Sequence, residues 1–134
     1  MTKVRLFWAG LLLVTLLASA SIGQRGGGKA EPLRIEFKRG ASGATLNDTI
    51  RGSEEAEYVF TARQGQRVTL SLTATPAKSA RFELKSADGV DYKFEHDGMK
   101  WSGVAPVTGD YFLNVTRVSQ KPGRTTYLLR LAIK

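Results

Sequence analysis

Apolar and polar residues alternate along much of the chain between residues 58 and 73. Every second residue is apolar over 58–62, and the alternation resumes over 68–72. A period of two places these apolar residues on one face of an extended strand. The alternation breaks at Gly65, a residue that readily takes the positive φ of a tight turn. We therefore predict a central hairpin of two half-buried strands joined at Gly65.

The same alternation predicts further short strands on both sides of this hairpin. They are expected near residues 33–37, 45–50, 82–84, 92–94, 99–104, 111–115 and 127–133. Gly- and Pro-containing turns separate them, and we detect no helical period and no internal repeat. About eight short strands with such turns predict an all-β fold, a single antiparallel β-sandwich. A jelly-roll-like arrangement is favoured because it hides many strand edges.

The first 20 residues have the features of a secretory signal peptide. Lys3 and Arg5 precede an apolar run, which ends in the small residues Ala18-Ser19-Ala20. The run is shorter than the ~20 residues needed to span a bilayer, so we expect cleavage and no remaining membrane anchor. The expected product is periplasmic or secreted. The predicted organisation is a signal peptide over 1–20, a Gly-rich flexible linker over 21–32 and the β-sandwich domain over 33–134.

Composition limits the classes of function. The 134 residues include no cysteine, which excludes disulfides, thiolate metal sites and a cysteine nucleophile. The net charge is +8, and removal of Lys3 and Arg5 lowers it by two to +6. A basic exported protein is suited to acidic glycans, anionic lipids or an acidic protein, whereas nucleic acid is not expected there. The alternative is that the charge only maintains solubility.

Candidate catalytic residues are sparse. His96 is the single histidine, and no serine lies on a strand-to-helix turn that would make it a nucleophile for this histidine. The aspartates near it do not have the spacing of a calcium-binding loop. We therefore expect a protein that is not an enzyme and that has no cofactor and no metal.

The charge distribution near the C-terminus points to a binding loop. No acidic residue follows Asp110, whereas Arg117, Lys121 and Arg124 bracket the turn between the last two predicted strands. Arginine on a rigidly held loop is well suited to bidentate capture of carboxylates. The alternative is a solvated basic loop without a partner.

Several segments together resemble a known family. They are Ile35-Glu-Phe-Lys-Arg-Gly40, Ile50-Arg-Gly52, Tyr58-x-Phe60-x-Ala62-x-x-Gly65-Gln66-x-Val68, Gly109-Asp-Tyr111 and the closing strand at Tyr127. This set resembles the periplasmic inhibitors of g-type lysozyme and covers about residues 33–134. It is also similar to the broader pre-peptidase C-terminal-like β-sandwich domains.

The resemblance implies an inhibitor that blocks the active-site cleft of a g-type lysozyme. The cleft's acidic groups act on the glycosidic bond, and a basic loop would pair with them. On this basis the partner-binding candidates are Arg117, Lys121 and Arg124 of the basic loop, Thr108, Gly109 and Tyr111 of a Ser-Gly-x-Tyr-like segment, and Ser53, whose loop carries an aromatic residue in those inhibitors. Tyr111 also shares a face with Leu113, which is equally typical of a core residue.

One alternative function remains open at this stage. The same scaffold also suits a non-catalytic envelope- or carbohydrate-binding module, with peptidoglycan or another envelope glycan as its ligand. Trp101 is the candidate stacking platform for a sugar in that case.

Overall fold

The structure, a computed structural model, describes residues 31–90, 97–119 and 121–134. The expected signal peptide, most of the expected linker, the strand expected near 92–94 and His96 lie outside these residues. The described strands are β1 (Leu33–Arg34), β2 (Gly43–Arg51), β3 (Glu55–Ala62), β4 (Arg67–Thr75), β5 (Ala80–Ser86), β6 (Lys100–Val104), β7 (Gly109–Arg117) and β8 (Arg124–Ile133). Within the described ranges, no helix is long and apolar enough to cross a membrane.

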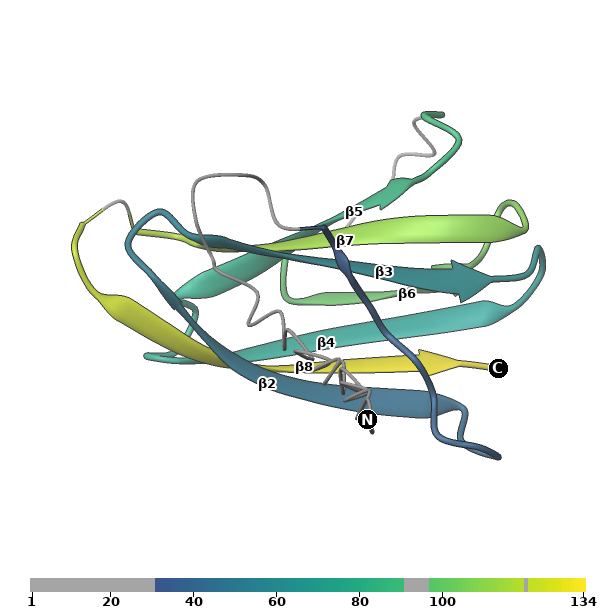
Figure 1. Cartoon of the computed structure of the whole chain (residues 1–134), viewed down its shortest axis with the longest axis horizontal. Helices are drawn as coiled ribbons and strands as arrows, with labels where there is room; N and C mark the ends of the chain where they lie inside the picture. Colours follow the sequence, from purple (N-terminus) through teal and green to yellow (C-terminus); the bar gives the residue numbers. More distant parts are fainter. Residues whose placement is uncertain (1–30, 91–96, 120) are drawn as a thin grey trace, which may run out of the picture.

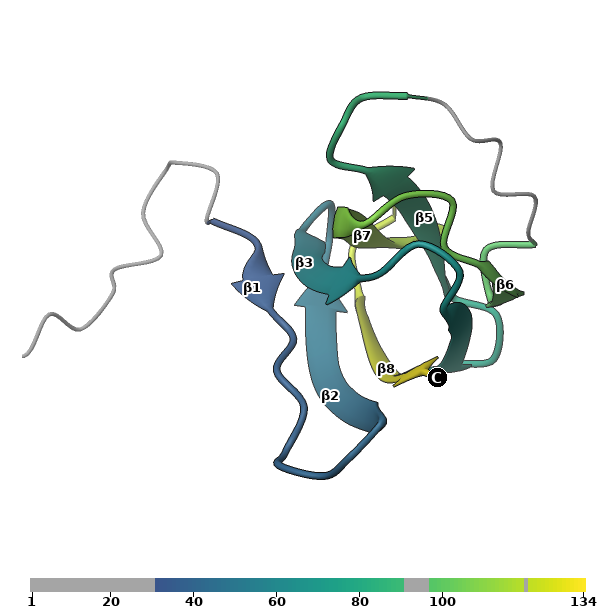
Figure 2. The same cartoon turned by 90° about the vertical axis from the view of Figure 1, so that its right-hand side faces the viewer.

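The strands form two four-stranded sheets that face each other (Figures 1 and 2). One sheet has the order β1-β3-β7-β5 and the other has the order β2-β8-β4-β6. All neighbouring strands are antiparallel, with the exception of the short β1, which runs parallel to β3. The predicted all-β sandwich is therefore confirmed.

Successive strands lie in opposite sheets. The odd-numbered strands make up one sheet and the even-numbered strands the other, so each connection between consecutive strands crosses the sandwich. This connectivity is jelly-roll-like, because strands adjacent in a sheet are distant in the sequence. The connections other than the one between β5 and β6 lie at the two ends of the sandwich, where loops of both sheets come together (Figure 1).

The predicted central hairpin is wrong. β3 and β4 belong to different sheets, and the turn at Gly65 joins the sheets instead of pairing the two strands. Gly65 has a φ of 89°, as expected for a tight turn. Its backbone N–H donates to the Ala105 oxygen at 3.0 Å, and the N–H of Arg67 donates to the Lys134 oxygen at 2.8 Å. The turn's hydrogen bonds therefore come from loops and strands that sequence alternation does not identify as neighbours.

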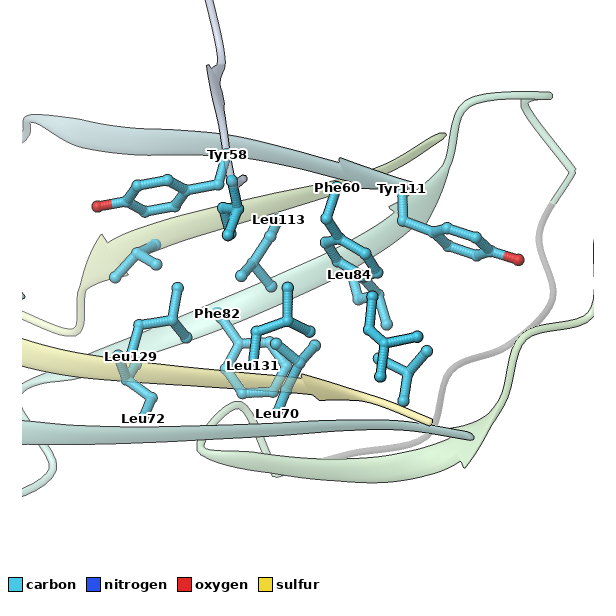
Figure 3. Packing of buried hydrophobic residues seen from close by; sticks show 14 of the residues in the cluster. Tyr58, Phe60, Leu70, Leu72, Phe82, Leu84, Tyr111, Leu113, Leu129 and Leu131 are labelled. Carbon is cyan, nitrogen blue, oxygen red and sulfur yellow. The ribbon is translucent and has the colours of Figure 1, made fainter. Parts of the chain in front are cut away.

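The core lies between the sheets and is built from the inward-facing residues of both (Figure 3). Phe60 of β3 stacks on Tyr111 of β7, with ring centroids 5.5 Å apart and planes 14° apart. The hydroxyls of Tyr58 and Tyr127 form a buried hydrogen bond between the two sheets. Burial raises the pKa of both tyrosines above the ordinary value, so both hydroxyls stay protonated. This bond satisfies two polar groups inside an otherwise apolar core.

The N-terminal strand is shorter than predicted. The sequence predicts a strand over 33–37, whereas β1 spans Leu33–Arg34 alone. Ile35 still donates its N–H to the Val59 oxygen at 2.8 Å and is buried in the core. The apolar alternation therefore identified a residue that packs in the core, although the chain leaves the sheet directly after it.

Candidate functional site

The candidate binding residues lie at opposite ends of the sandwich. β7 begins at Gly109 and ends at Arg117. At a rise of about 3.4 Å per residue, these positions are roughly 27 Å apart. Gly109 begins β7 and Thr108 bonds to Gln64 of the β3–β4 connection, so both lie at the end where β3 leads into β4 (Figure 1), which we call the Thr108 end. The turn over 51–54 and residues 117–119 and 121–124 lie at the other end, which we call the Arg117 end.

Arg117 ties the loops of its end together. Its Nη1 donates to the Gly52 oxygen at 3.0 Å and to the Lys121 oxygen at 2.8 Å. Its Nε donates to the hydroxyl of Thr125 at 3.2 Å, and Thr125 is fully buried. The half-buried guanidinium therefore bridges the β2–β3 turn, the β7–β8 loop and the start of β8. All three acceptors are neutral groups, so none of these contacts is an ion pair.

A hydrogen bond between Gly52 and Gly123 brings the two loops together. The N–H of Gly52 donates to the Gly123 oxygen at 2.9 Å. Gly123 has a φ of 151°, and a Cβ there would lie 2.9 Å from Nη2 of Arg117. A larger residue at position 123 would displace the guanidinium, so glycine is needed for this arrangement.

Three exposed cationic side chains surround this bridge. Arg51 and Arg124 are direct partners in the register of β2 and β8, and Lys121 follows in the neighbouring loop. Across the described part of the chain, the single ion pair is formed elsewhere by Arg34 and Asp110, so none of the three has an ionic partner there. Sequence reasoning found Arg124 and Lys121 but missed Arg51, because only the strand register places it beside Arg124.

Ser53 belongs to the same end as the basic loop. It is exposed between Gly52 and Glu54 in the turn that leads from β2 to β3. Glu54 closes this turn, because its carboxylate accepts the N–H of Arg51 at 3.0 Å and its own N–H donates to the Arg51 oxygen at 2.9 Å. The hydroxyl of Ser53 is therefore presented to solvent on a turn that is closed from both sides.

The candidates at the Thr108 end have a different environment. The hydroxyl of Thr108 accepts the N–H of Gln64 at 2.9 Å, which holds the two inter-sheet connections together. Tyr111 is buried, with 2% of its surface exposed. Its hydroxyl donates to the Val107 oxygen at 2.6 Å and accepts the Val107 N–H at 3.2 Å. Tyr111 is thus a core residue that supports the loop before β7, which is one of the two roles its alternation predicted.

Asp110 does not face the Arg117 end. It lies on the outer face of its sheet, where it accepts hydrogen bonds from Arg34 Nη2 at 2.8 Å and from the Thr61 hydroxyl at 2.7 Å. These hydrogen bonds lower the pKa of Asp110 to about 2, and the same contact raises the pKa of Arg34. The pair fastens β1 to the sheet. The negative charge of Asp110 is thereby kept away from the exposed cations at the other end.

The described residues offer little for catalysis or metal binding. No group of three or more His, Asp or Glu side chains among them is arranged to hold a metal ion. Trp101 is half-buried and packs against the core on the inner side of β6. A Cβ at Gly103 would lie 2.6 Å from its indole ring, so the ring occupies the space above that glycine. This placement does not provide the outward-facing sugar platform considered for Trp101.

Comparison with known proteins shows sequence similarity along nearly the whole chain. No protein-family model matches the sequence. An inhibitor of g-type lysozyme from Escherichia coli K12 is 30% identical over an aligned length of 128 residues, and the match covers 92% of this chain and 92% of that inhibitor. The chain therefore belongs to the family of inhibitors of g-type lysozyme.

Solved structures share the sandwich at lower identity. PliG of Aeromonas hydrophila, a periplasmic inhibitor of g-type lysozyme, superposes with a TM-score of 0.64 at 20% identity, covering 77% of this chain and 96% of PliG. PliG of Salmonella Typhimurium gives 0.60 at 24% identity, covering 78% and 99%. The pre-peptidase C-terminal domain of a Bacillus anthracis collagenase gives 0.56 at 18% identity, covering 81% and 99%. These matches support the fold.

Proposed function

We propose that this protein inhibits a g-type lysozyme in the periplasm by presenting its Arg117 end to the active-site cleft of the enzyme. Membership in the inhibitor family supports the activity. The observation that supports the site is the group of three exposed cations, Arg51, Lys121 and Arg124, on loops that Arg117 joins. The protein acts by binding and carries out no reaction.

The chemistry of the contact follows from the charges on both sides. A glycoside hydrolase cleft contains carboxyl groups that act on the glycosidic bond. The guanidinium of Arg124 or Arg51 pairs with such a carboxylate through two parallel hydrogen bonds, and Lys121 adds a single cation. Ser53 donates or accepts a further hydrogen bond beside them. Occupation of the carboxylates excludes the sugar from the cleft.

Arg117 contributes mainly by holding the contact residues in place. Its guanidinium is already bonded to three groups of the protein. Fixing two loops before binding lowers the ordering cost of complex formation, and so increases affinity. We propose the same supporting role for Tyr111 at the Thr108 end. Thr108 and Gly109 also lie at that end, and they are too far from the Arg117 end to contact the same small cleft.

Parallel assays of bacterial cell-wall lysis test the proposed activity. The purified exported protein is added to g-type, c-type and i-type lysozymes at equal enzyme activity. We expect inhibition of the g-type enzyme and no effect on the other two. Failure to inhibit any of the three would contradict the proposal, and it would favour a binding module built on the same scaffold.

A further inference from the structure

The outer face of the β2-β8-β4-β6 sheet carries cations without outward-facing carboxylates. Five exposed basic residues point outward from it: Arg51 of β2, Arg67 of β4, Lys100 of β6, and Arg124 and Arg130 of β8. Within these four strands Asp48 is the one acidic residue. Asp48 lies between the outward-facing Asn47 and Thr49 in the sequence, so its side chain is on the opposite side of β2.

The opposite sheet has a different charge balance. Its outward positions combine the acidic residues Glu55, Glu57, Glu83 and Asp110 with the basic residues Arg34, Arg81 and Lys85. Four acidic and three basic side chains nearly cancel, whereas the β2-β8-β4-β6 face holds five uncompensated cations. Much of the positive charge of the domain is therefore concentrated on one flat face, which we call the basic face.

Hydroxyl groups fill the space between these cations. Most of the outward positions between them carry hydroxyls, namely Thr45, Thr49, Thr69, Ser71, Thr73, Thr75, Ser102 and Thr126; the others are Asn47, Leu128 and Ala132, and Leu128 is half-buried. A shallow depression of about 300 Å³ lies between β4 and β6. It is lined by Thr69, Leu70, Ser71, Lys100, Trp101 and Ser102. Its lining thus combines three hydroxyls and one ammonium group with the apolar Leu70 and Trp101, which suits a sugar that carries negative charge.

We propose that the basic face binds a linear polysaccharide that carries carboxylates. The hydroxyls hydrogen-bond to the sugar rings, and the arginines pair with the carboxylates. Aromatic stacking contributes little, because the outward positions of these strands hold no aromatic residue and Trp101, which lines the depression, packs against the core. Recognition therefore depends on charge, and a neutral polysaccharide is not bound.

The dimensions of the face fit an extended chain. Arg124 and Arg130 are six residues apart on β8, or roughly 20 Å at about 3.3 Å per residue. Arg130 lies in one row with Ser71 and Lys100 across the neighbouring strands. A polysaccharide that follows β8 passes the Arg51–Arg124 pair first and the Arg130 row next, so two groups of cations meet the same chain.

An anionic bilayer fits the same charge less well. Peripheral membrane contacts combine basic residues with apolar side chains that enter the lipid. Among the exposed large hydrophobic residues of the described chain, Val104 is the one that lies on the basic face. The face therefore has the charge for a bilayer but little apolar surface to insert.

The test uses a triple variant and a charge-matched control. Arg67→Gln, Lys100→Gln and Arg130→Gln together remove three cations from the basic face and leave the Arg117 end unchanged. Arg63→Gln, Arg81→Gln and Lys85→Gln remove three exposed cations elsewhere. Binding of both proteins and wild type to polygalacturonate, to neutral pullulan and to phosphatidylglycerol vesicles is measured by calorimetry or sedimentation. Thermal unfolding confirms that all three proteins are folded.

We expect wild type to bind polygalacturonate and not pullulan. Since each exposed ion contact contributes a factor of about 1.5–5, the basic-face variant should lose roughly tenfold in affinity. The control should lose less than about twofold. Raising NaCl to 1 M, where the Debye length is about 3 Å, should abolish binding. Equal losses in the two variants, no binding to polygalacturonate, or binding to vesicles in preference to polygalacturonate would each overturn the proposal.

The basic face shares Arg51 and Arg124 with the lysozyme contact, but its other cations can be removed separately. The basic-face variant retains the loops of the Arg117 end, so we expect it to inhibit g-type lysozyme as well as wild type does. A protein that inhibits lysozyme but does not bind polygalacturonate would contradict the polysaccharide site alone.

Discussion

The guanidinium of Arg117 donates a hydrogen bond to the backbone oxygen of Gly52, 3.0 Å away and 65 residues earlier in the sequence. The bond joins the connection that follows β2 to the end of β7, and so links the two sheets at one end of the sandwich. Because the same guanidinium also holds Lys121 and Thr125, the loops around it form one preorganised unit.

Replacement of Arg117 should destabilise the protein. Arg117→Gln removes three charge-assisted hydrogen bonds and leaves the buried hydroxyl of Thr125 without this donor. We expect a loss of about 1.5–3 kcal/mol in the free energy of unfolding, measured by urea denaturation. Arg124→Gln is the control, since Arg124 is exposed and its loss should cost less than about 0.5 kcal/mol. Equal losses in the two variants would show that Arg117 does not hold the loops.

The Tyr58–Tyr127 hydrogen bond should behave as a coupled pair. Each single Tyr→Phe change leaves the other hydroxyl buried without its partner, at a cost of about 1–3 kcal/mol. The double variant removes both hydroxyls, so its cost should be clearly smaller than the sum of the two single costs. A double-mutant cycle by urea denaturation measures this difference. Additive losses would mean that the two hydroxyls do not stabilise each other.

The Arg34–Asp110 pair gives stability that depends on pH. The pKa of Asp110 is lowered to about 2 in the folded protein, whereas an aspartate in an unfolded chain has a pKa of about 3.9. The contribution is therefore present above about pH 4 and is lost as the pH falls through 2. Arg34→Gln should raise the pKa of Asp110 towards its ordinary value, as followed by carboxyl-carbon NMR. Arg81→Gln should leave it unchanged, and a wild-type value near 4 would contradict the pairing.

Apolar alternation was sufficient to predict most of the strands. β4 and β8 were found because their buried residues occupy every second position. The alternation reports which side of a strand is buried, and that information is local. It does not report how far a strand continues. β2 extends to nine residues because it pairs along its whole length with β8.

The local alternation of apolar residues could not predict which strands pair with each other. Gly65 takes the positive φ that a hairpin needs, yet the same conformation serves a turn between two sheets. The choice between the two is made by distant partners, Ala105 and Lys134, which bind the turn and the start of β4. The predicted hairpin failed for this reason.

The sequence predicted which types of residue form the candidate site, but it did not predict which of these residues lie together. The run of basic residues after Asp110 identified Lys121 and Arg124 correctly as exposed cations. Their proximity to Ser53 and Arg51 follows from the β2–β8 register, which the sequence does not show. Arg117 was grouped with Lys121 and Arg124 as a partner-binding residue, whereas its hydrogen bonds indicate that it holds the two loops together.

The central claim is that the Arg117 end blocks the lysozyme cleft. Lys121→Glu with Arg124→Glu reverses two exposed charges at this end. Arg63→Glu with Lys134→Glu makes the same change in charge at the Thr108 end. Both pairs are exposed, so both proteins should unfold at nearly the wild-type temperature.

The most direct measurement is the inhibition constant of these two double variants against a g-type lysozyme. Reversal at the Arg117 end should raise the constant by about 100-fold or more, equivalent to ~2.7 kcal/mol, because like charges then meet in the cleft. Reversal at the Thr108 end should change it by less than about 3-fold. Unchanged inhibition by the Arg117-end variant, or an equal loss in both, would contradict the account.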